Sequence, residues 1–204
     1  MDPLAGLVLC GGDSSRMGED KCFLRYHRHP QWEHLVRLLE PLCSSVMVSC
    51  QVRQLSRLSE ALPSLPHPPL LAADLPELAG HGPMSGLLTA AHRLPGHSFL
   101  LVGCDYPLLT AEVLQRLIGA RRKENDAVCF SRGAEAVDEP LVTIYEATAL
   151  PAIRESFRNG EYSLRKTLQQ LRTVRLEIPS GDPLLSVDTP EEFHQAMARM
   201  KSAS

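Results

Sequence analysis

Short apolar runs alternate with amphipathic stretches along most of this chain, and this alternation constrains the fold more than any other feature. The apolar runs have the length and composition of β-strands and cover Leu4–Cys10, Val46–Cys50, Leu70–Ala73, Ser98–Cys104, Asp126–Ser131, Leu141–Tyr145, Val174–Ile178 and Leu184–Val187. Between them, apolar residues recur at helical spacing, as at Trp32, Leu35, Val36, Leu38 and Leu39 and again at Val113, Leu114, Leu117 and Ile118. Strands and helices in this order form parallel βαβ units. The pattern therefore predicts an α/β fold with a mostly parallel sheet and helices on both faces.

The chain is expected to form a single domain over residues 1–204, because its length suffices for one sizeable core. The stretch LPSLPHPPL, residues 62 to 70, has the composition of a linker or a surface loop. The alternation resumes directly after it, which favours a loop inside one domain. A last helix is predicted to follow Thr189, since Thr-Pro-Glu-Glu supplies an N-cap, a proline at the first position and acids in the first turn.

Composition excludes several classes of function. The net charge of −3 and the lack of a basic block argue against a nucleic-acid partner. No apolar run approaches the ~20 residues that span a bilayer, and MDPLAGLVLC lacks the positive region of a signal peptide. The cysteines contain no C-x-x-C pair and are expected to be reduced thiols. We therefore expect a cytoplasmic protein without a membrane partner.

A glycine-rich polar segment follows the first predicted strand, in the sequence LVLCGGDSSRMGEDK of residues 7 to 21. Gly11 and Gly12 would let backbone N–H groups approach an anion, and Arg16 and Lys21 add positive charge. Ligands of open α/β sheets bind beyond the carboxyl ends of the strands, which is where this segment lies. Phosphate is the ligand that this chemistry suits, and a glycine-rich turn without a ligand is the alternative.

Asp105 follows another buried strand, again at its carboxyl end. It is poorly placed to cap the next helix, because Thr110 before Ala111 and Glu112 is the better N-cap. A carboxylate here suits Mg²⁺, which takes one or two carboxylates and completes its shell with water and substrate phosphates. A structural turn aspartate is the alternative.

The order of residues in the opening loop resembles the L-x-G-G-x-S-x-R-M-G-x-D-K signature of the MobA-like nucleotidyltransferases, with Cys10 where alanine is usual. Further segments resemble the family in the same order: Asp74 followed by GPMSGL at residues 82–87, LLVGCDYPLL at 100–109, EPLVTIY at 139–145 and SVDTPEE at 186–192. The resemblance extends from about residue 4 to residue 198. It implies a Rossmann-like fold similar to nucleotide-diphospho-sugar transferases.

The resemblance also implies a reaction, in which a phosphate oxygen of an acceptor attacks the α-phosphorus of a nucleoside triphosphate and pyrophosphate leaves. Arg16, Lys21 and Asp105 would be catalytic, with Asp105 holding Mg²⁺ and the cations neutralising the leaving phosphates. The nucleotide would contact Leu9, Cys10, Gly11, Gly12, Arg16, Lys21, Asp74, Gly82, Pro83, Gly86 and Asp105. Asp74 is also explained as a plain turn residue.

Asp188 departs from the family pattern, which carries asparagine there, and Ser186 departs likewise. Asp188 could be a second metal ligand beside Asp105, or it could cap the last helix. The departure bears on the identity of the acceptor. Arg158, Arg165 and Lys166 could flank the acceptor phosphate, or they could be solvated surface residues.

The best specific hypothesis is guanylyl transfer from GTP to molybdenum-bound molybdopterin. The alternatives are cytidylyl transfer, transfer to a sugar or polyol phosphate, and a non-catalytic nucleotide-binding protein. Contacts with other cofactor-synthesis proteins are a further expectation from the resemblance.

Overall fold

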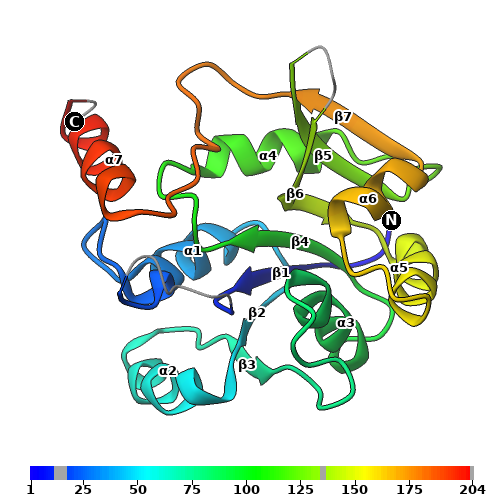
Figure 1. The fold of residues 1–204 in the computed structure, drawn as a ribbon, viewed down its shortest axis with the longest axis horizontal. Helices are drawn as coiled ribbons and strands as arrows, with labels where there is room; N and C mark the ends of the chain where they lie inside the picture. Colours follow the sequence, from blue (N-terminus) through cyan, green and yellow to red (C-terminus); the bar gives the residue numbers. More distant parts are fainter. Residues whose placement is uncertain (12–17, 134–136, 203–204) are drawn as a thin grey trace.

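A computed structural model of the protein describes residues 1–11, 18–133 and 137–202. Its centre is a seven-stranded sheet in the order β3-β2-β1-β4-β6-β5-β7 (Figure 1). The strands are β1 (Leu4–Leu9), β2 (Ser45–Cys50), β3 (Leu70–Ala73), β4 (Ser98–Gly103), β5 (Ala127–Arg132), β6 (Val137–Tyr145) and β7 (Thr173–Glu177). All neighbouring strands pair in parallel except β6, which runs antiparallel to both β4 and β5. The predicted mostly parallel sheet is confirmed.

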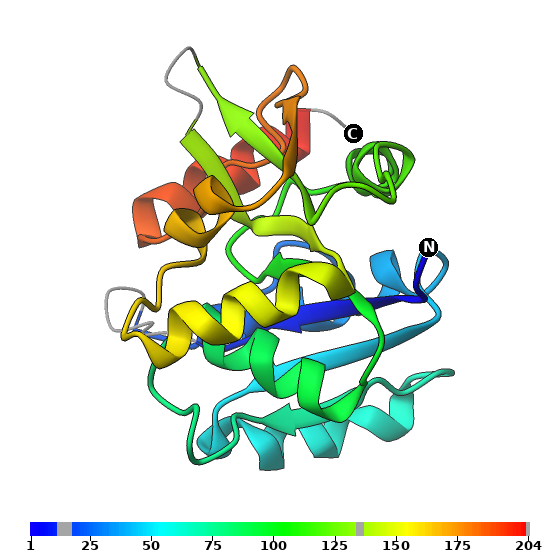
Figure 2. The same ribbon diagram turned by 90° about the vertical axis from the view of Figure 1, so that its right-hand side faces the viewer.

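Helices cover both faces of the sheet, as predicted. The helices α1 (Gln31–Leu39), α2 (Leu55–Ala61) and α4 (Ala111–Gly119) supply one hydrophobic cluster, and α3 (Pro83–Arg93), α5 (Leu150–Arg158) and α6 (Leu164–Gln170) supply the other. In Figure 2, α3 and α5 lie side by side against one face. The last helix, α7 (Pro190–Ser202), packs through Phe193 and Ala196 on Tyr26 and Val187.

Successive side chains of β1 point to opposite faces of the sheet, so this one strand contributes to both hydrophobic clusters. Leu4 and Val8 join the cluster of α1, whereas Leu7 and Leu9 join the cluster of α3. All six residues of β1 are buried, as expected for a parallel strand covered on both faces.

One predicted strand, Leu184–Val187, is wrong: these residues form a loop. Leu184 and Val187 are buried, but Leu184 packs in the cluster of α1, α2 and α4, Val187 packs on α7 and Tyr26, and neither pairs with a strand of the described sheet. The Val187 N–H donates to the carbonyl oxygen of Asp105 over 2.8 Å, which brings this loop to the carboxyl end of β4. The apolar composition of this segment therefore indicated that it is buried, but not whether it pairs as a strand.

The remaining expectations on organisation can be checked directly. The stretch 62–70 contains a short 3-10 helix, Leu62–Ser64, and the entry into β3, which pairs with β2 in the same sheet. The six cysteines are free thiols, as predicted. Within the described residues, no helix has the length and apolar character needed to cross a membrane.

Candidate active site

The carboxyl ends of β1 and β4 lie side by side, because Leu9 pairs with Gly103 in the parallel ladder. Gly11 and Asp105, which follow these strands, therefore line the same hollow, of about 200 Å³, and Lys21 also lines it. Gly11, the described glycine of the predicted turn, and Asp105 therefore share one cleft, as predicted. Gly12 and Arg16 lie outside the described residues.

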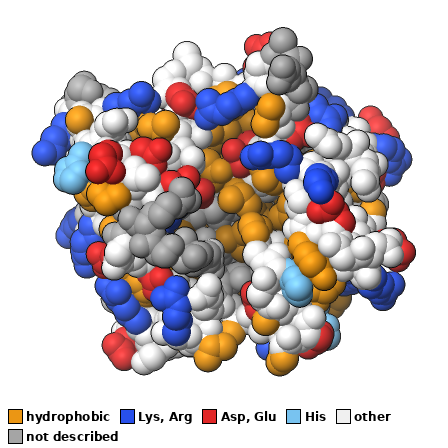
Figure 3. Space-filling view, viewed as in Figure 1, with side chains coloured by type: hydrophobic (Ala, Val, Ile, Leu, Met, Phe, Trp, Pro, Cys, Tyr) orange, Lys and Arg blue, Asp and Glu red, His pale blue; other side chains and the backbone are white. Residues whose placement is uncertain are grey.

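A second hollow, of about 470 Å³, adjoins the first and shares Leu9, Gly11, Gly82 and Pro83 with it. It extends to Asp74 at the end of β3 and is bounded by the β3–α3 loop, residues 74–82. All the described residues that were predicted to contact the nucleotide line one or both hollows. Figure 3 shows the molecule hollowed at its centre on this side, with hydrophobic side chains on the floor.

Glycines let the start of α3 come close to the sheet. A Cβ on Gly86 would lie 2.6 Å from Ser49 Oγ and 2.7 Å from Leu9 Cδ2, so no larger residue fits there. Gly82 has a φ of 65°, which glycine adopts readily, and Pro83 occupies the start of the helix, as predicted. The backbone of this segment therefore forms the wall of the second hollow.

Asp105 is half-buried and lines the first hollow, where the surrounding protein desolvates its carboxylate. Burial raises its pKa to about 6; a backbone hydrogen bond and the Lys21 charge oppose the rise, whereas the negative charges of Glu139 and Asp188 add to it. A Cβ on Gly103 would lie 2.5 Å from Asp105 Oδ1, so the glycine makes room for this carboxylate. Thr110 caps α4 by accepting a hydrogen bond from Val113 N over 3.4 Å, and the prediction that Asp105 is not this cap is confirmed.

Lys21 pairs with Asp188, a contact that sequence reasoning missed. Lys21 begins a short 3-10 helix, Lys21–Phe23, and its Nζ donates to Asp188 Oδ1. The N-terminus of α7 is capped by Thr189 and Glu192, with Glu192 N donating to Thr189 Oγ1 over 3.3 Å. The alternative in which Asp188 caps this helix is therefore not supported. The Asp188 carboxylate instead pairs with the ammonium group of Lys21.

Other residues of the site were not singled out from the sequence. Ser49, Gln51 and Leu141 line the hollows, and Tyr106 OH donates to Glu139 Oε1 over 2.6 Å just beside Asp105. The sequence could have pointed to Tyr106 and Glu139, since both lie in segments that resemble the family: Tyr106 directly follows Asp105, and Glu139 directly precedes Pro140.

The donor set suits a magnesium ion that arrives with a nucleotide. Among the described residues, no three or more His, Cys, Asp or Glu side chains are grouped to hold a metal by themselves. Mg²⁺ bound through substrate phosphates needs only one or two carboxylates. A desolvated carboxylate such as Asp105, whose raised pKa reports an unfavourable charge, fits that requirement.

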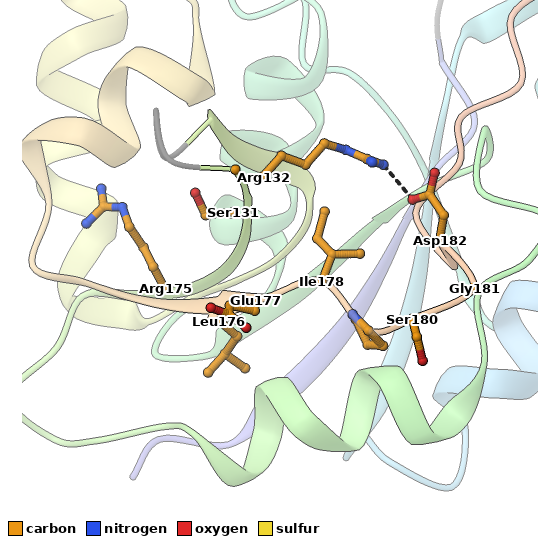
Figure 4. A pocket seen from close by; sticks show the side chains of 11 residues that line it. Ser131, Arg132, Arg175, Leu176, Glu177, Ile178, Ser180, Gly181 and Asp182 are labelled. Carbon is orange, nitrogen blue, oxygen red and sulfur yellow. Dashed lines mark hydrogen bonds and ion pairs between the residues drawn. The ribbon is translucent and has the colours of Figure 1, made fainter.

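A further hollow, of about 740 Å³, lies at the carboxyl ends of β5 and β7 and is shown in Figure 4. Its two arginines are each engaged by a carboxylate: Arg132 pairs with Asp182 at 2.8 Å and Arg175 with Asp138 at 2.9 Å. None of the described residues that were predicted to bind the nucleotide lines this hollow.

Known proteins resemble this chain over most of its length. Residues 6–175 match the model of the MobA-like NTP transferase domain. The chain is 30% identical over 194 residues to a molybdenum cofactor biosynthesis bifunctional protein of Synechocystis, covering 95% of this chain but only 53% of that protein. It is 31% identical over 191 residues to a molybdenum cofactor guanylyltransferase of Pseudomonas fluorescens, covering 93% of this chain and 91% of that enzyme.

Solved structures share the fold. A molybdopterin-guanine dinucleotide biosynthesis protein A of Archaeoglobus fulgidus superposes with a TM-score of 0.78 at 20% identity, covering 97% of this chain and 99% of that one. A nucleotidyl transferase from Methanothermobacter superposes with a TM-score of 0.80 at 15% identity, covering 99% of both chains. The predicted fold class is confirmed.

Proposed function

Because the chain belongs to the MobA-like NTP transferase domain family, we propose that it transfers the guanylyl group of GTP to the phosphate of molybdenum-bound molybdopterin. The observation that carries this proposal is the pair of adjoining hollows that bring Gly11, Lys21 and Asp105 to one end and Asp74 to the other. Several relatives named molybdenum cofactor guanylyltransferase support the choice of GTP and acceptor.

The first hollow suits the triphosphate. An acceptor phosphate oxygen forms a bond to the α-phosphorus while the bond to the bridging oxygen of the β-phosphate breaks, and that electron pair leaves with pyrophosphate. Lys21 stabilises the charge that builds on the leaving group, and Gly11 brings backbone close to the phosphates. Gly12 and Arg16 are proposed to act with them.

Asp105 is proposed to hold Mg²⁺, with Asp188 as a second carboxylate. The ion would supply positive charge to the phosphates during transfer. When Asp188 takes this role, its pairing with Lys21 must loosen, so that the Nζ of Lys21 turns to the phosphates.

The second hollow suits guanine. Asp74 is half-buried, burial raises its pKa, and Ser49 Oγ donates to its Oδ1 over 3.4 Å. An ionised carboxylate only accepts hydrogen bonds. Guanine offers two adjacent donors, the ring N1–H and the amino group, whereas cytosine offers its amino group beside the acceptor N3. Asp74 is therefore proposed to favour guanine.

Arg165 is the predicted acceptor-side cation that the structure supports best. Its Nε donates to the Asp138 carbonyl oxygen over 3.1 Å, and it forms no ion pair in the described part of the chain. Lys166, by contrast, pairs with Glu161 at 2.8 Å. The charge of Arg165 opposes the rise that burial causes in the pKa of Tyr106, the residue after Asp105, so Arg165 is proposed to act on the acceptor phosphate.

Pyrophosphate release by purified protein tests the proposal, with GTP or CTP as donor, Mg²⁺ present, and molybdopterin or a sugar phosphate as acceptor. We expect release only with GTP and molybdopterin together. A preference for CTP would replace the guanylyl assignment, and release with sugar phosphates would replace the acceptor. Binding of GTP without any turnover would point to the non-catalytic alternative.

A further inference from the structure

Three aromatic side chains meet on the outer side of the β3–α3 loop. The His81 ring stacks on the Tyr162 ring, with centroids 3.9 Å apart and planes at 27°. The Phe157 ring lies 5.1 Å from each of these rings between centroids, with its plane at 89° to that of His81 and at 66° to that of Tyr162. Phe157 belongs to α5 and packs on the core beneath α3. The cluster therefore ties the β3–α3 loop to the α5–α6 loop, residues 159–163, far away in the sequence.

The β3–α3 loop needs such a restraint. Gly80 and Gly82, on either side of His81, have φ angles of 86° and 65°, and both line the second hollow. Glycine backbone samples many conformations, and ordering it costs entropy. The His81 N–H donates to Ser85 Oγ over 3.1 Å, which joins one point of the loop to α3. His81 itself is not among the described residues that line the second hollow, so its stacked ring does not occupy that hollow.

We propose that the stacked pair of His81 and Tyr162 fixes the Gly80–Gly82 backbone in the shape that receives the nucleotide base. Both are positioning residues, since neither lines the hollow. The inference rests on the proposed function and adds to it. If the loop is already ordered, nucleotide binding does not have to supply the entropy cost of ordering it. The aromatic pair therefore affects nucleotide affinity. An aromatic pair of this kind corresponds to about a two- to tenfold change in Kd.

The test measures the Kd of GTP with Mg²⁺ for the full chain and for the variants His81→Ala, Tyr162→Ala and both together. We expect each single variant to raise the Kd about two- to tenfold, and the double variant to raise it no further, because the two rings act as one pair. Tyr162→Phe keeps the stack and is expected to restore the Kd to within about twofold of wild type. The kcat at saturating nucleotide should remain that of wild type.

Leu70→Ala is the control, since Leu70 on β3 is 51% exposed and is not one of the three clustered aromatic residues. A second measurement follows hydrogen exchange of the His81 amide without nucleotide, which we expect to quicken about two- to tenfold in Tyr162→Ala. A wild type that binds and transfers, beside alanine variants with unchanged Kd and exchange, overturns the inference alone. Equal weakening by Tyr162→Phe and Tyr162→Ala overturns it as well. A wild type that binds no nucleoside triphosphate overturns the proposed function, and the exchange rate still decides whether the stack holds the loop.

Discussion

Lys21 and Asp188 form an ion pair across 167 residues of sequence, and this pair joins the loop after β1 to the segment that precedes α7. Its two side chains are 17% and 37% exposed, and Lys21 lines the first hollow. The carboxylate of Asp188 also contributes to the raised pKa of Asp105. One side chain from the C-terminal segment thus acts on both the cation and the carboxylate of the proposed phosphate site.

Asp188→Asn distinguishes the roles open to this residue. If Asp188 is a second ligand of Mg²⁺, the asparagine variant should need about three- to tenfold more Mg²⁺ for half-maximal activity, since a neutral amide binds the ion less well. The measurement is activity against Mg²⁺ concentration at saturating GTP. An unchanged Mg²⁺ requirement would leave Asp188 with only its pairing to Lys21.

Replacement of Lys21 or Asp105 should remove catalysis. Lys21→Ala and Asp105→Asn are each expected to lower kcat by about 10²- to 10³-fold, because each takes away charge that the transition state requires. The rate of pyrophosphate release checks this, with Lys166→Ala as the matched control for loss of an exposed lysine. Near-wild-type rates in both variants would contradict the proposed site.

Asp105→Asn should also stabilise the metal-free protein. The folded pKa of Asp105, about 6, lies above the value of 3.8 for a free carboxyl, so the folded state binds its proton more tightly. Stability from this group is present below pH 3.8 and is lost as the pH rises through 6. At pH 8 without Mg²⁺, the free energy of unfolding of the asparagine variant should therefore exceed that of wild type by about 1–3 kcal/mol. Denaturant titration at pH 8 and pH 4 checks this, and a gain of the same size at both pH values would contradict it.

Asp74→Asn should weaken the choice of base. We expect kcat/KM for GTP to fall about tenfold or more, because the amide offers one acceptor where the carboxylate offers two, while the value for CTP changes less. The ratio of kcat/KM for the two nucleotides is the measurement. Parallel losses for GTP and CTP would show that Asp74 contacts the sugar or supports the loop.

Arg165→Gln should raise the KM for the acceptor and leave the Kd for GTP unchanged, since Arg165 is proposed to act on the acceptor phosphate. We expect the KM for the acceptor to rise about tenfold, as for the loss of a charge-assisted hydrogen bond. Lys166→Gln alters the neighbouring cation, which already pairs with Glu161, and serves as the control. Equal effects of the two substitutions on acceptor KM would contradict a specific role for Arg165.

Acid should destabilise the protein through His34. Its ring stacks on His27 with centroids 3.5 Å apart, and burial, with the charges of His27 and His29, lowers its pKa from 6.5 to about 4. The unfolded state therefore binds more protons between these values, and stability falls as the pH drops from 6.5 towards 4. Because the ring is partly exposed, we expect a loss of about 1–2 kcal/mol. His34→Phe should flatten this dependence of the free energy of unfolding, whereas His67→Phe, at an exposed position, should not.

The sequence alone determined the class of fold and which strand ends carry most of the candidate site. Periodicity reports burial within a short segment, so the strands and helices that depend on local pattern, such as β1 and α4, were predictable. The positions of Gly11, Asp74 and Asp105 at strand ends followed from the same reasoning, since the ends of parallel strands share one edge of a sheet.

Tertiary structure alone decided the contacts between distant segments. The loop at Leu184–Val187 reads as a strand because it is buried, but only the packing of α7 and the sheet shows that no strand lies beside it. The antiparallel course of β6, the pairing of Lys21 with Asp188 and the stacking of His81 on Tyr162 likewise depend on which elements meet in space. No spacing along the chain encodes such meetings, because they result from how whole layers pack.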